Sequence, residues 1–388
     1  MADIKPKRKS AIQRGQVHSY DPNNFNPEPF FITTDDPDVI LKNIKPYLGK
    51  YISVDTETHP LHMNSHEVPK GIVRRWVGKG KAAVPQDLPF CISISDGTQC
   101  FTMYDSLENG FKNIIALKPL LEDTSIEKIF HNYKFDGHEL ANIGVKIKGK
   151  LHDTVVLTKL VDENRPAFTL VTLARALPKC ITLYEDMVDN YKKTHKIVDY
   201  RQIPRPLLSA YANADVWNCI HVFIDEYAKL EKDELVPLYT TELELMLCLF
   251  EMERVGMRVN LDYEKPLKED LQKLMDDAEK EIYEEAGGLF NINSGKQLYN
   301  VLLKLGVDRT FIAMSDKGNP VLDKDALNDL AEKHGVSIVL KILEFRKYEK
   351  LLGTYAVGIY AQRDNAGRVH CSINQTEADL LPLKCNVA

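Results

Sequence analysis

The sequence predicts an α/β domain followed by a mainly α-helical region. Short β-rich runs alternate with segments of helical periodicity from about residue 50 to residue 160, which is the pattern of a sheet flanked by helices. From about residue 233 onward, nearly every segment has helical periodicity. The 388 residues are enough for two or three domains with packed cores. We divide the chain into a flexible basic arm (1–28), an α/β domain (29–232), a helical region (233–376) and a tail (377–388).

The individual elements follow from side-chain periodicity and from capping residues. Strands are predicted where β-branched and aromatic residues dominate, and helices where apolar residues recur every three to four positions. Asp153 and Ser294 are expected to cap helices, and Gly256 to end one. A stretch rich in glycine and proline, 60–88, predicts a long inserted loop. The candidate strands are 51–55, 90–95, 99–103 and 128–132, and the candidate helices are 111–121, 134–143, 154–161, 206–230, 238–255, 263–286, 294–304, 323–333 and 336–360.

Net charge and composition exclude several classes of protein. The chain carries 50 Lys and Arg against 56 Asp and Glu, a net charge of −6, so it is not a general polyanion-binding protein. Two local basic stretches, 5–14 and 70–81, are either solvated surface or phosphate-binding segments. No apolar run approaches the roughly 20 residues of a membrane-spanning helix, and the N-terminus lacks the apolar stretch of a signal peptide. The seven cysteines contain no C-x-x-C pair, which argues against a zinc ribbon or a disulfide scaffold.

Three short motifs carry carboxylates near the ends of predicted strands or at helix faces. Asp55 and Glu57 follow the first strong strand, and residues two apart in a strand point to the same face, about 6.6 Å from each other. Asp136 lies where a strand runs into a helix, and Tyr211 and Asp215, four residues apart, share one helix face. Each motif alone also has an ordinary explanation: a solvated turn, a charge at a helix N-terminus, or an amphipathic helix with a half-buried tyrosine.

Carboxylates that converge on one point need cations to coexist in the ionised form. Two like charges about 4 Å apart repel by about 4 kcal/mol at an effective dielectric constant of about 20. Hard divalent cations that prefer oxygen ligands, Mg²⁺ or Mn²⁺, fit an all-carboxylate site. If the three motifs meet in the fold, they therefore predict a divalent-metal site.

The motifs Asp-x-Glu, Asn-x-x-Phe-Asp and Tyr-x-x-x-Asp, in this order and about 80 residues apart, resemble the 3′-5′ exonuclease domain of the DnaQ-like superfamily in its tyrosine-containing DEDDy class. The family fold is ribonuclease-H-like, a mixed central sheet flanked by helices. The resemblance implies a two-metal-ion mechanism with Mg²⁺ or Mn²⁺, in which Asp55 bridges both ions. Glu57 and Asp215 would hold the first ion, and Asp136 would support the second, largely through water. Tyr211 and Glu57 would orient the attacking water, and these five residues form the expected catalytic set.

Four segments of the helical region resemble, in order, the signatures that open the polymerase region of family A (DNA polymerase I-like) DNA polymerases. They cover the thumb and its junction with the palm: 251–259, 288–298, 350–355 and 369–376. The resemblance ends there, because the tail 377–388 does not continue into the family's next segment. The metal-binding aspartates of the palm and the nucleotide-gripping residues of the fingers are absent from this sequence. Polymerase activity is therefore not expected from this chain alone.

The resemblance also suggests which residues contact nucleic acid. The expected partners are a single-stranded DNA 3′ end and primer-template DNA, together with a separately encoded polymerase palm and fingers fragment. In the thumb-like region, exposed lysines are candidates for phosphate contacts. Arginines of the basic loop are candidates for guiding the strand. The residues concerned are Asn132, Arg74, Arg75, Lys296, Lys347 and Lys350.

The function that the resemblance implies is metal-dependent 3′-5′ hydrolysis of DNA to nucleoside 5′-monophosphates. The chain would then be the proofreading part of a family A DNA polymerase in replication, in a bacterial cytoplasm or a phage-infected host cell. Two alternatives stay open. One is a non-catalytic DNA-binding or assembly fragment of a split polymerase, and the other is a stand-alone RNA-trimming exonuclease.

Overall fold

The computed structural model describes residues 18–60, 72–77, 84–375 and 384–386, and these residues form two compact units. The first unit contains the described residues up to Gly256 together with those after residue 369. The second contains residues 257–369. In the described parts of the chain, none of the helices has both the length and the apolar sequence needed to span a membrane.

The first unit is built on a six-stranded mixed sheet with the strand order β1-β6-β5-β2-β7-β8. Its central strand β2 runs antiparallel to β5 and parallel to β7, so it is paired on both edges. The pairs β1 with β6 and β7 with β8 are also parallel, and β5 with β6 is antiparallel. The strands are β1 (Phe31–Thr34), β2 (Tyr51–His59), β5 (Leu88–Ser95), β6 (Cys100–Tyr104), β7 (Glu127–Phe130) and β8 (Leu151–Asp153).

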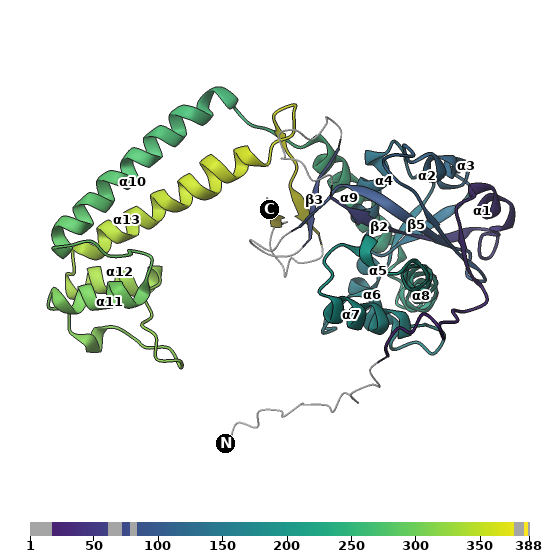
Figure 1. Cartoon of the computed structure of the whole chain (residues 1–388), viewed down its shortest axis with the longest axis horizontal. Coiled ribbons are helices and arrows are strands. Elements are labelled where there is room, and N and C mark those ends of the chain that lie inside the picture. The colour runs from purple at the N-terminus through teal and green to yellow at the C-terminus, as the bar shows by residue number, and fades with distance from the viewer. Residues whose placement is uncertain (1–17, 61–71, 78–83, 376–383, 387–388) are drawn as a thin grey trace, which may run out of the picture. The chain divides into compact units, whose positions relative to one another are not determined.

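Helices flank this sheet, as the sequence predicts (Figure 1). The 28-residue helix α8 contacts five of the six strands and so covers most of one face. Apolar side chains of the strands and helices, such as Ile52, Ile92 and Ile220, form one continuous core and exclude water from it. The helices are α1 (Pro37–Asn43), α2 (Lys112–Ala116), α3 (Lys118–Leu121), α4 (Tyr133–Asn142), α5 (Thr154–Val161), α6 (Leu170–Ala174), α7 (Leu183–His195), the 3₁₀ segment η3 (Tyr200–Gln202), α8 (Arg205–Lys232) and α9 (Val236–Val255).

Two segments near the chain's beginning differ from simple loops. The predicted loop 60–88 contains the strands β3 (Arg75–Val77) and β4 (Val84–Gln86), which pair antiparallel and so satisfy each other's backbone groups. The segment predicted as a long inserted loop therefore contains a pair of short strands. Residues 61–71 and 78–83 lie outside the described residues. At the end of the predicted arm, the Tyr20 ring contacts Tyr191 of α7 at a centroid distance of 6.0 Å. That contact attaches the end of the arm to the first unit.

The second unit is a helical assembly with its own apolar core. Its two long helices, α10 and α13, pack against each other. Ser294 caps α11 by accepting a hydrogen bond from the Gln297 N–H, as predicted. The elements are β9 (Met257–Arg258), η4 (Leu261–Tyr263), α10 (Glu264–Ala286), α11 (Gly295–Lys304), η5 (Arg309–Phe311), α12 (Lys324–His334), α13 (Ile338–Lys350), the π-helical segment η6 (Leu351–Ile359) and β10 (Arg368–Val369), which pairs with β9. Two further strands, β11 (Ser372–Asn374) and β12 (Lys384–Asn386), pair within the first unit.

The predicted boundary between the two domains at residue 233 stays a prediction. The helix α9 follows that boundary, and its contacts group it with the first unit. Gly256 ends α9 with φ +64°, a conformation that glycine adopts without steric cost.

Candidate active site

The candidate site lies where strand β2 loses its parallel partner. β7 pairs with β2 only at Tyr51, Ile52 and Ser53, and β7 ends at Phe130. The last residues of β2 therefore have a ladder on the β5 side but not on the β7 side. Such openings at the carboxyl ends of neighbouring parallel strands are common places for ligand sites in α/β proteins.

Asp136 of helix α4 occupies the open edge of β2. Its carboxylate Oδ1 accepts hydrogen bonds from the Thr56 N–H at 2.9 Å and from the Thr56 hydroxyl at 2.7 Å. The Asp136 side chain is almost fully buried, with 2% of its surface exposed. The backbone donor of Thr56 that β7 leaves without a ladder partner is thus satisfied by a carboxylate, which fixes Asp136 beside the strand.

Asp55 and Glu57 point to the other face of β2, because side chains alternate along a strand. On that face, the Ser53 hydroxyl donates to the Val216 carbonyl of α8 at 2.7 Å and ties the helix to the strand. Val216 follows Asp215, so this contact brings the Asp215 carboxylate next to Asp55. The sequence motifs at residues 55–57 and 215 are therefore joined by direct packing of α8 on β2.

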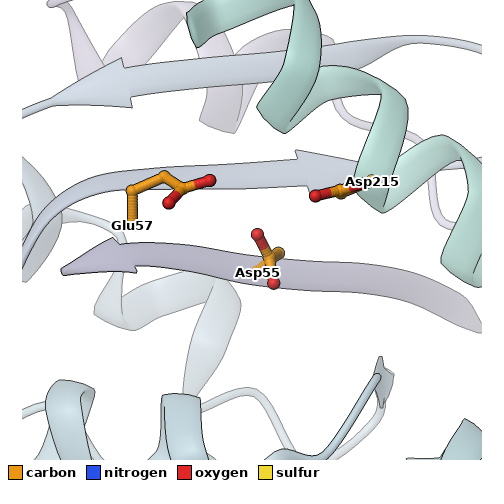
Figure 2. A group of neighbouring side chains, drawn as sticks. All are labelled: Asp55, Glu57 and Asp215. Atoms are coloured by element: carbon orange, nitrogen blue, oxygen red, sulfur yellow. The ribbon is translucent and has the colours of Figure 1, made fainter. Parts of the chain in front are cut away.

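Three carboxylates form a cluster that we call the carboxylate cluster: Asp55, Glu57 and Asp215. One oxygen atom from each lies within 4.8 Å of one oxygen atom from each of the others. Figure 2 shows the three side chains turned toward a common space, two from β2 and one from α8. All three side chains are half-buried.

The electrostatics of the cluster favour protonation in the absence of a cation. Burial raises the pKa of Asp55 to about 7, opposed by the hydrogen bond from the Thr56 N–H. Burial also raises the pKa of Glu57, and the charges of Asp55 and Asp215 raise it further. The pKa of Asp215 is raised by burial and by Asp55, whereas a hydrogen bond from Tyr211 lowers it. A divalent cation at this position would remove these penalties by supplying the missing positive charge.

Asp136 and Tyr211, the other two residues of the predicted set, are not members of the carboxylate cluster but interact with it. Burial raises the pKa of Asp136, and the charge of Asp55 adds to this effect, so the two carboxylates act on each other through space. Tyr211 lies one helical turn before Asp215, and burial together with the charges of Asp215 and Glu57 raises the pKa of its phenol. The structure therefore brings Asp55, Glu57 and Asp215 together. Tyr211 adjoins Asp215 on α8, and Asp136 is held by Thr56, whose side chain lies on the opposite face of β2. The catalytic roles of all five residues stay a prediction.

The donor set fits a hard divalent cation. Three carboxylates within reach of one point supply oxygen ligands only, which suits Mg²⁺ or Mn²⁺ rather than a metal that prefers sulfur or imidazole. Burial is the largest cause of the raised pKa values of all three carboxylates, and the charges of neighbouring carboxylates add to it at Glu57 and Asp215. The residues present could therefore hold a metal.

Two residues near the motifs have clear structural positions. Asn132 starts α4 with φ 71°, in the left-handed region that asparagine tolerates, and its side chain is exposed. The carboxylate of Asp153 accepts hydrogen bonds from Val155 N–H and Val156 N–H at the start of α5. This confirms the prediction that Asp153 caps the helix.

The arginines and lysines that are candidates for DNA contacts lie in both units. Arg74 binds the buried Asp87 through two hydrogen bonds, with its Nε at 2.7 Å from Oδ1. Arg75 belongs to β3, and its side chain lies outside the described residues. Lys296 on α11 and two lysines of α13, Lys347 and Lys350, are exposed on the second unit.

Sequence reasoning missed Thr56, Lys192 and Tyr200. Thr56 stands inside the Asp-x-Glu motif, and strand alternation alone places its side chain on the face opposite to the two carboxylates. Lys192 and Tyr200 lie on α7 and η3, which the sequence analysis did not predict as elements. The Tyr200 ring nevertheless lies 6.2 Å from the Tyr211 ring, centroid to centroid. No motif marked these two residues, because the contact is made only by the tertiary fold.

Comparisons with known proteins agree with the two-part organisation. A family model described as 3′-5′ exonuclease matches residues 33–233, and one described as DNA polymerase family A matches residues 261–383. DNA polymerase I of Chloroflexus aurantiacus is 29% identical over 271 residues, which cover 68% of this chain and 28% of the relative. The DNA polymerase of Escherichia phage T5 is 28% identical, with coverages of 68% and 33%. DNA polymerase DpoZ of Salmonella phage PMBT28 is 27% identical, with coverages of 76% and 48%.

A solved structure shares the fold. The POL domain of Pol1 from M. smegmatis, in complex with DNA primer-template and dNTP, matches 77% of this chain and 48% of its own with a TM-score of 0.57 and 24% identity. The chain spans less than half the length of each of these relatives. The 3′-5′ exonuclease match nevertheless covers more than half of this chain. The chain therefore belongs to the 3′-5′ exonuclease family and carries, after that region, part of a family A DNA polymerase region.

Proposed function

We propose that the chain is a metal-dependent 3′-5′ exonuclease that hydrolyses DNA from its 3′ end and releases nucleoside 5′-monophosphates. The observation that carries this proposal is the carboxylate cluster, whose three oxygen atoms lie within 4.8 Å of one another. Its position inside the region that matches the 3′-5′ exonuclease family supports the assignment. The activity is the proofreading function of a family A DNA polymerase, in the cytoplasm of a bacterium or of a phage-infected cell.

The residues divide the work between holding cations and orienting water. Asp55, Glu57 and Asp215 would hold one divalent cation, and Asp55 would also hold a second, which Asp136 would support largely through water. When bound, the two cations supply Lewis-acid stabilisation of the charge that develops on the attacking and departing oxygens. Tyr211 and Glu57 form hydrogen bonds with the attacking water and so set its direction. No covalent bond between enzyme and nucleotide is needed, because water itself displaces the 3′ oxygen.

DNA contacts extend this site in the proposed enzyme. Asn132 is exposed at the start of the helix that bears Asp136, and it is proposed to contact the nucleotide. Arg74 and Arg75 guide the strand, although the Arg74 guanidinium also holds Asp87 and so has a structural task. Thumb-like lysines contact the phosphates of primer-template DNA: Lys296, Lys347 and Lys350. A separately encoded polymerase palm and fingers fragment is the proposed protein partner.

A direct assay tests the nuclease. The protein is incubated with Mg²⁺ and single-stranded DNA labelled on its 3′-terminal nucleotide, and release of the labelled monophosphate is followed by chromatography. The variant Asp55→Ala/Glu57→Ala should release it at least about 1000-fold more slowly, because it loses two ligands of the proposed cations. Glu163→Ala, at an exposed position of the same unit, is the control and should match the wild type. No release by the wild type, or equal release by the double variant, contradicts the proposal.

A second candidate function is that of a non-catalytic DNA-holding fragment. The observation that favours it is the match of residues 261–383 to DNA polymerase family A, a region separate from the carboxylate cluster. In that case the protein binds primer-template DNA with equal affinity whether or not Asp55 and Glu57 are replaced, and it releases no nucleotide. Fluorescence anisotropy with a labelled primer-template, run beside the nuclease assay, distinguishes the two functions.

A further inference from the structure

A lysine stands beside the carboxylate cluster without being part of any motif. Lys192 lies in the last turn of α7, and its ammonium donates a hydrogen bond to the Tyr200 hydroxyl at 2.8 Å. The same nitrogen lies 4.0 Å from the centroid of the Tyr200 ring. Both side chains are half-buried. The ammonium is thus held in one place by a hydrogen bond and a cation–π contact rather than free to move with solvent.

Tyr200 connects this ammonium to the catalytic set. Its ring contacts the ring of Tyr211 at 6.2 Å between centroids, and Tyr211 lies one helical turn from Asp215 and bonds to its carboxylate. The chain of contacts runs from α7 through η3 to α8. The electrostatic effect agrees with this placement, since the charge of Lys192 lowers the pKa of Glu57.

The neighbouring lysine shows what an ordinary surface position on α7 looks like. The Lys193 side chain is 78% exposed and lies 3.8 Å from the Asp189 carboxylate, one turn away on the same helix. Lys192, one residue earlier, faces Tyr200 instead. The two lysines have the same chemistry and the same helix but different surroundings, so they form a matched pair for experiment.

We propose that Lys192 binds a non-bridging phosphate oxygen of the 3′-terminal phosphodiester, with Tyr200 holding the ammonium in position. This inference rests on the proposed function. An ammonium has three donors, and the bond to Tyr200 uses one of them, which leaves two for phosphate oxygens. The need is electrostatic, because a phosphodiester that approaches three carboxylates is repelled unless positive charge faces it. Lys192 supplies a fixed protein charge in addition to the proposed cations, and so it acts as a substrate-binding residue.

The test compares Lys192→Met with Lys193→Met on single-stranded oligodeoxythymidylate, with Mg²⁺, in steady-state kinetics. Lys192→Met should raise KM about tenfold, the loss expected for one charge-assisted hydrogen bond, and Lys193→Met should leave KM unchanged. In anisotropy measurements with Ca²⁺ in place of Mg²⁺, the slope of log affinity against log salt should fall by about 0.7 for Lys192→Met only. Lys192→Arg keeps the charge and should restore most of the affinity. Tyr200→Phe should raise KM less than Lys192→Met does.

A purely structural role for Lys192 predicts different results. It would lower the melting temperature of Lys192→Met without changing the salt slope, and Lys192→Arg would be as impaired as Lys192→Met. Either result overturns the inference, as does a KM of Lys192→Met equal to that of the wild type. If the wild type itself releases no nucleotide, the proposed nuclease function fails instead. The anisotropy measurements then still test phosphate binding by Lys192. If Lys192→Met and Lys193→Met bind DNA with equal affinity and equal salt dependence, phosphate binding by Lys192 is rejected.

Discussion

The first unit contains two acidic centres that the fold treats in opposite ways. In the carboxylate cluster, Asp55, Glu57 and Asp215 lie with one oxygen atom each within 4.8 Å of one another, and the pKa values of all three are raised. The second centre is the carboxylate of Glu253 on α9, which is fully buried. It accepts hydrogen bonds from Lys134 Nζ at 2.6 Å, from His138 Nε2 at 2.8 Å and from the Ile373 N–H at 2.6 Å. We call this second centre the Glu253 centre: Glu253, Lys134, His138 and the backbone of Ile373.

The difference separates a structural carboxylate from a functional one. At the Glu253 centre, every buried charge faces an opposite charge or a donor, so the group holds α4, α9 and β11 together. In the carboxylate cluster, like charges lie close together, and their repulsion destabilises the folded protein. Proteins retain such destabilising arrangements mainly where a ligand or a reaction needs them. Two residues of the Glu253 centre, Lys134 and His138, lie on either side of Asp136 on α4, so the structural centre also supports the helix that carries a catalytic carboxylate.

The largest effect on stability is expected at the Glu253 centre. Glu253→Ala leaves the buried Lys134 ammonium without its carboxylate and should lower the free energy of unfolding of the first unit by about 3–5 kcal/mol. Urea denaturation followed by circular dichroism measures this change. Glu251→Ala, at an exposed position on the same helix, is the control and should change stability little. Equal stability of the two variants would show that the paired centre contributes nothing to the fold.

The opposite sign is expected for the carboxylate cluster. Asp215→Asn removes one of three mutually repelling charges and should raise the stability of the metal-free protein by about 1 kcal/mol while it abolishes nuclease activity. The wild type should gain thermal stability on addition of Mn²⁺, and the variant should gain much less. Differential scanning calorimetry with and without Mn²⁺ measures both effects. Glu231→Gln, exposed on the same helix, should respond to Mn²⁺ as the wild type does. If the metal-free Asp215→Asn variant were less stable than the wild type, the Asp215 carboxylate would stabilise the fold. The contrast drawn with the Glu253 centre would then be wrong.

The two centres also differ in how far the sequence predicts them. The residues of the carboxylate cluster come from two motifs, Asp-x-Glu and Tyr-x-x-x-Asp, and the structure brings them together. The catalytic roles of Asp55, Glu57, Asp136, Tyr211 and Asp215 follow from the family resemblance and stay a prediction. The Glu253 centre carries no such signal, because Lys134 and Glu253 are 119 positions apart and become partners only through the packing of α4 on α9. Local rules correctly gave the caps at Asp153 and Ser294.

Several elements were also missed, for different reasons. Helix α7 (Leu183–His195) has apolar residues at helical spacing, with Tyr184 and Val188 buried, and this local signal was overlooked. Its tertiary contacts, such as that of Tyr184 with Phe25, could not be predicted from the sequence. The strands β3 and β4 lie in a segment rich in glycine and proline, and only their mutual pairing makes them strands. Motifs in the sequence therefore predict the chemistry, and apolar periodicity predicts helices and strands. Contacts between segments far apart in the sequence become visible only in the tertiary structure.

The raised pKa of Asp55 should make the stability of the metal-free protein depend on pH. The pKa of Asp55 is about 7 in the folded protein, above the usual value of 3.8. Between these two values the folded state binds more protons than the unfolded state, so the stability of the metal-free protein should fall as pH rises from about 4 to about 7. Melting temperatures in EDTA across this range measure the slope. Asp55→Asn should flatten it, and Mn²⁺ should reduce it in the wild type. A slope that Asp55→Asn leaves unchanged would assign the pH dependence to other groups.

The smallest expected effect concerns the hydrogen bonds that hold Asp136. Thr56→Val keeps the shape of the side chain but removes the hydroxyl that donates to Asp136 at 2.7 Å, while the backbone donor at 2.9 Å stays. The loss should cost about 1 kcal/mol of stability. The hydrogen bonds from Thr56 lower the pKa of Asp136, so their partial loss raises it.

A higher pKa of Asp136 leaves less of the carboxylate ionised at a given pH. The acid limb of the nuclease activity profile should therefore move to higher pH in Thr56→Val, and activity at high pH should approach that of the wild type. Thr33→Val, at an exposed position of β1 in the same sheet, should leave the profile unchanged. An acid limb that does not move while activity falls equally at every pH would show that Thr56 acts through packing rather than through the charge of Asp136. In that case the ionisation of Asp136 would not limit the activity at low pH. The electrostatic contrast with the Glu253 centre would then concern only Asp55, Glu57 and Asp215.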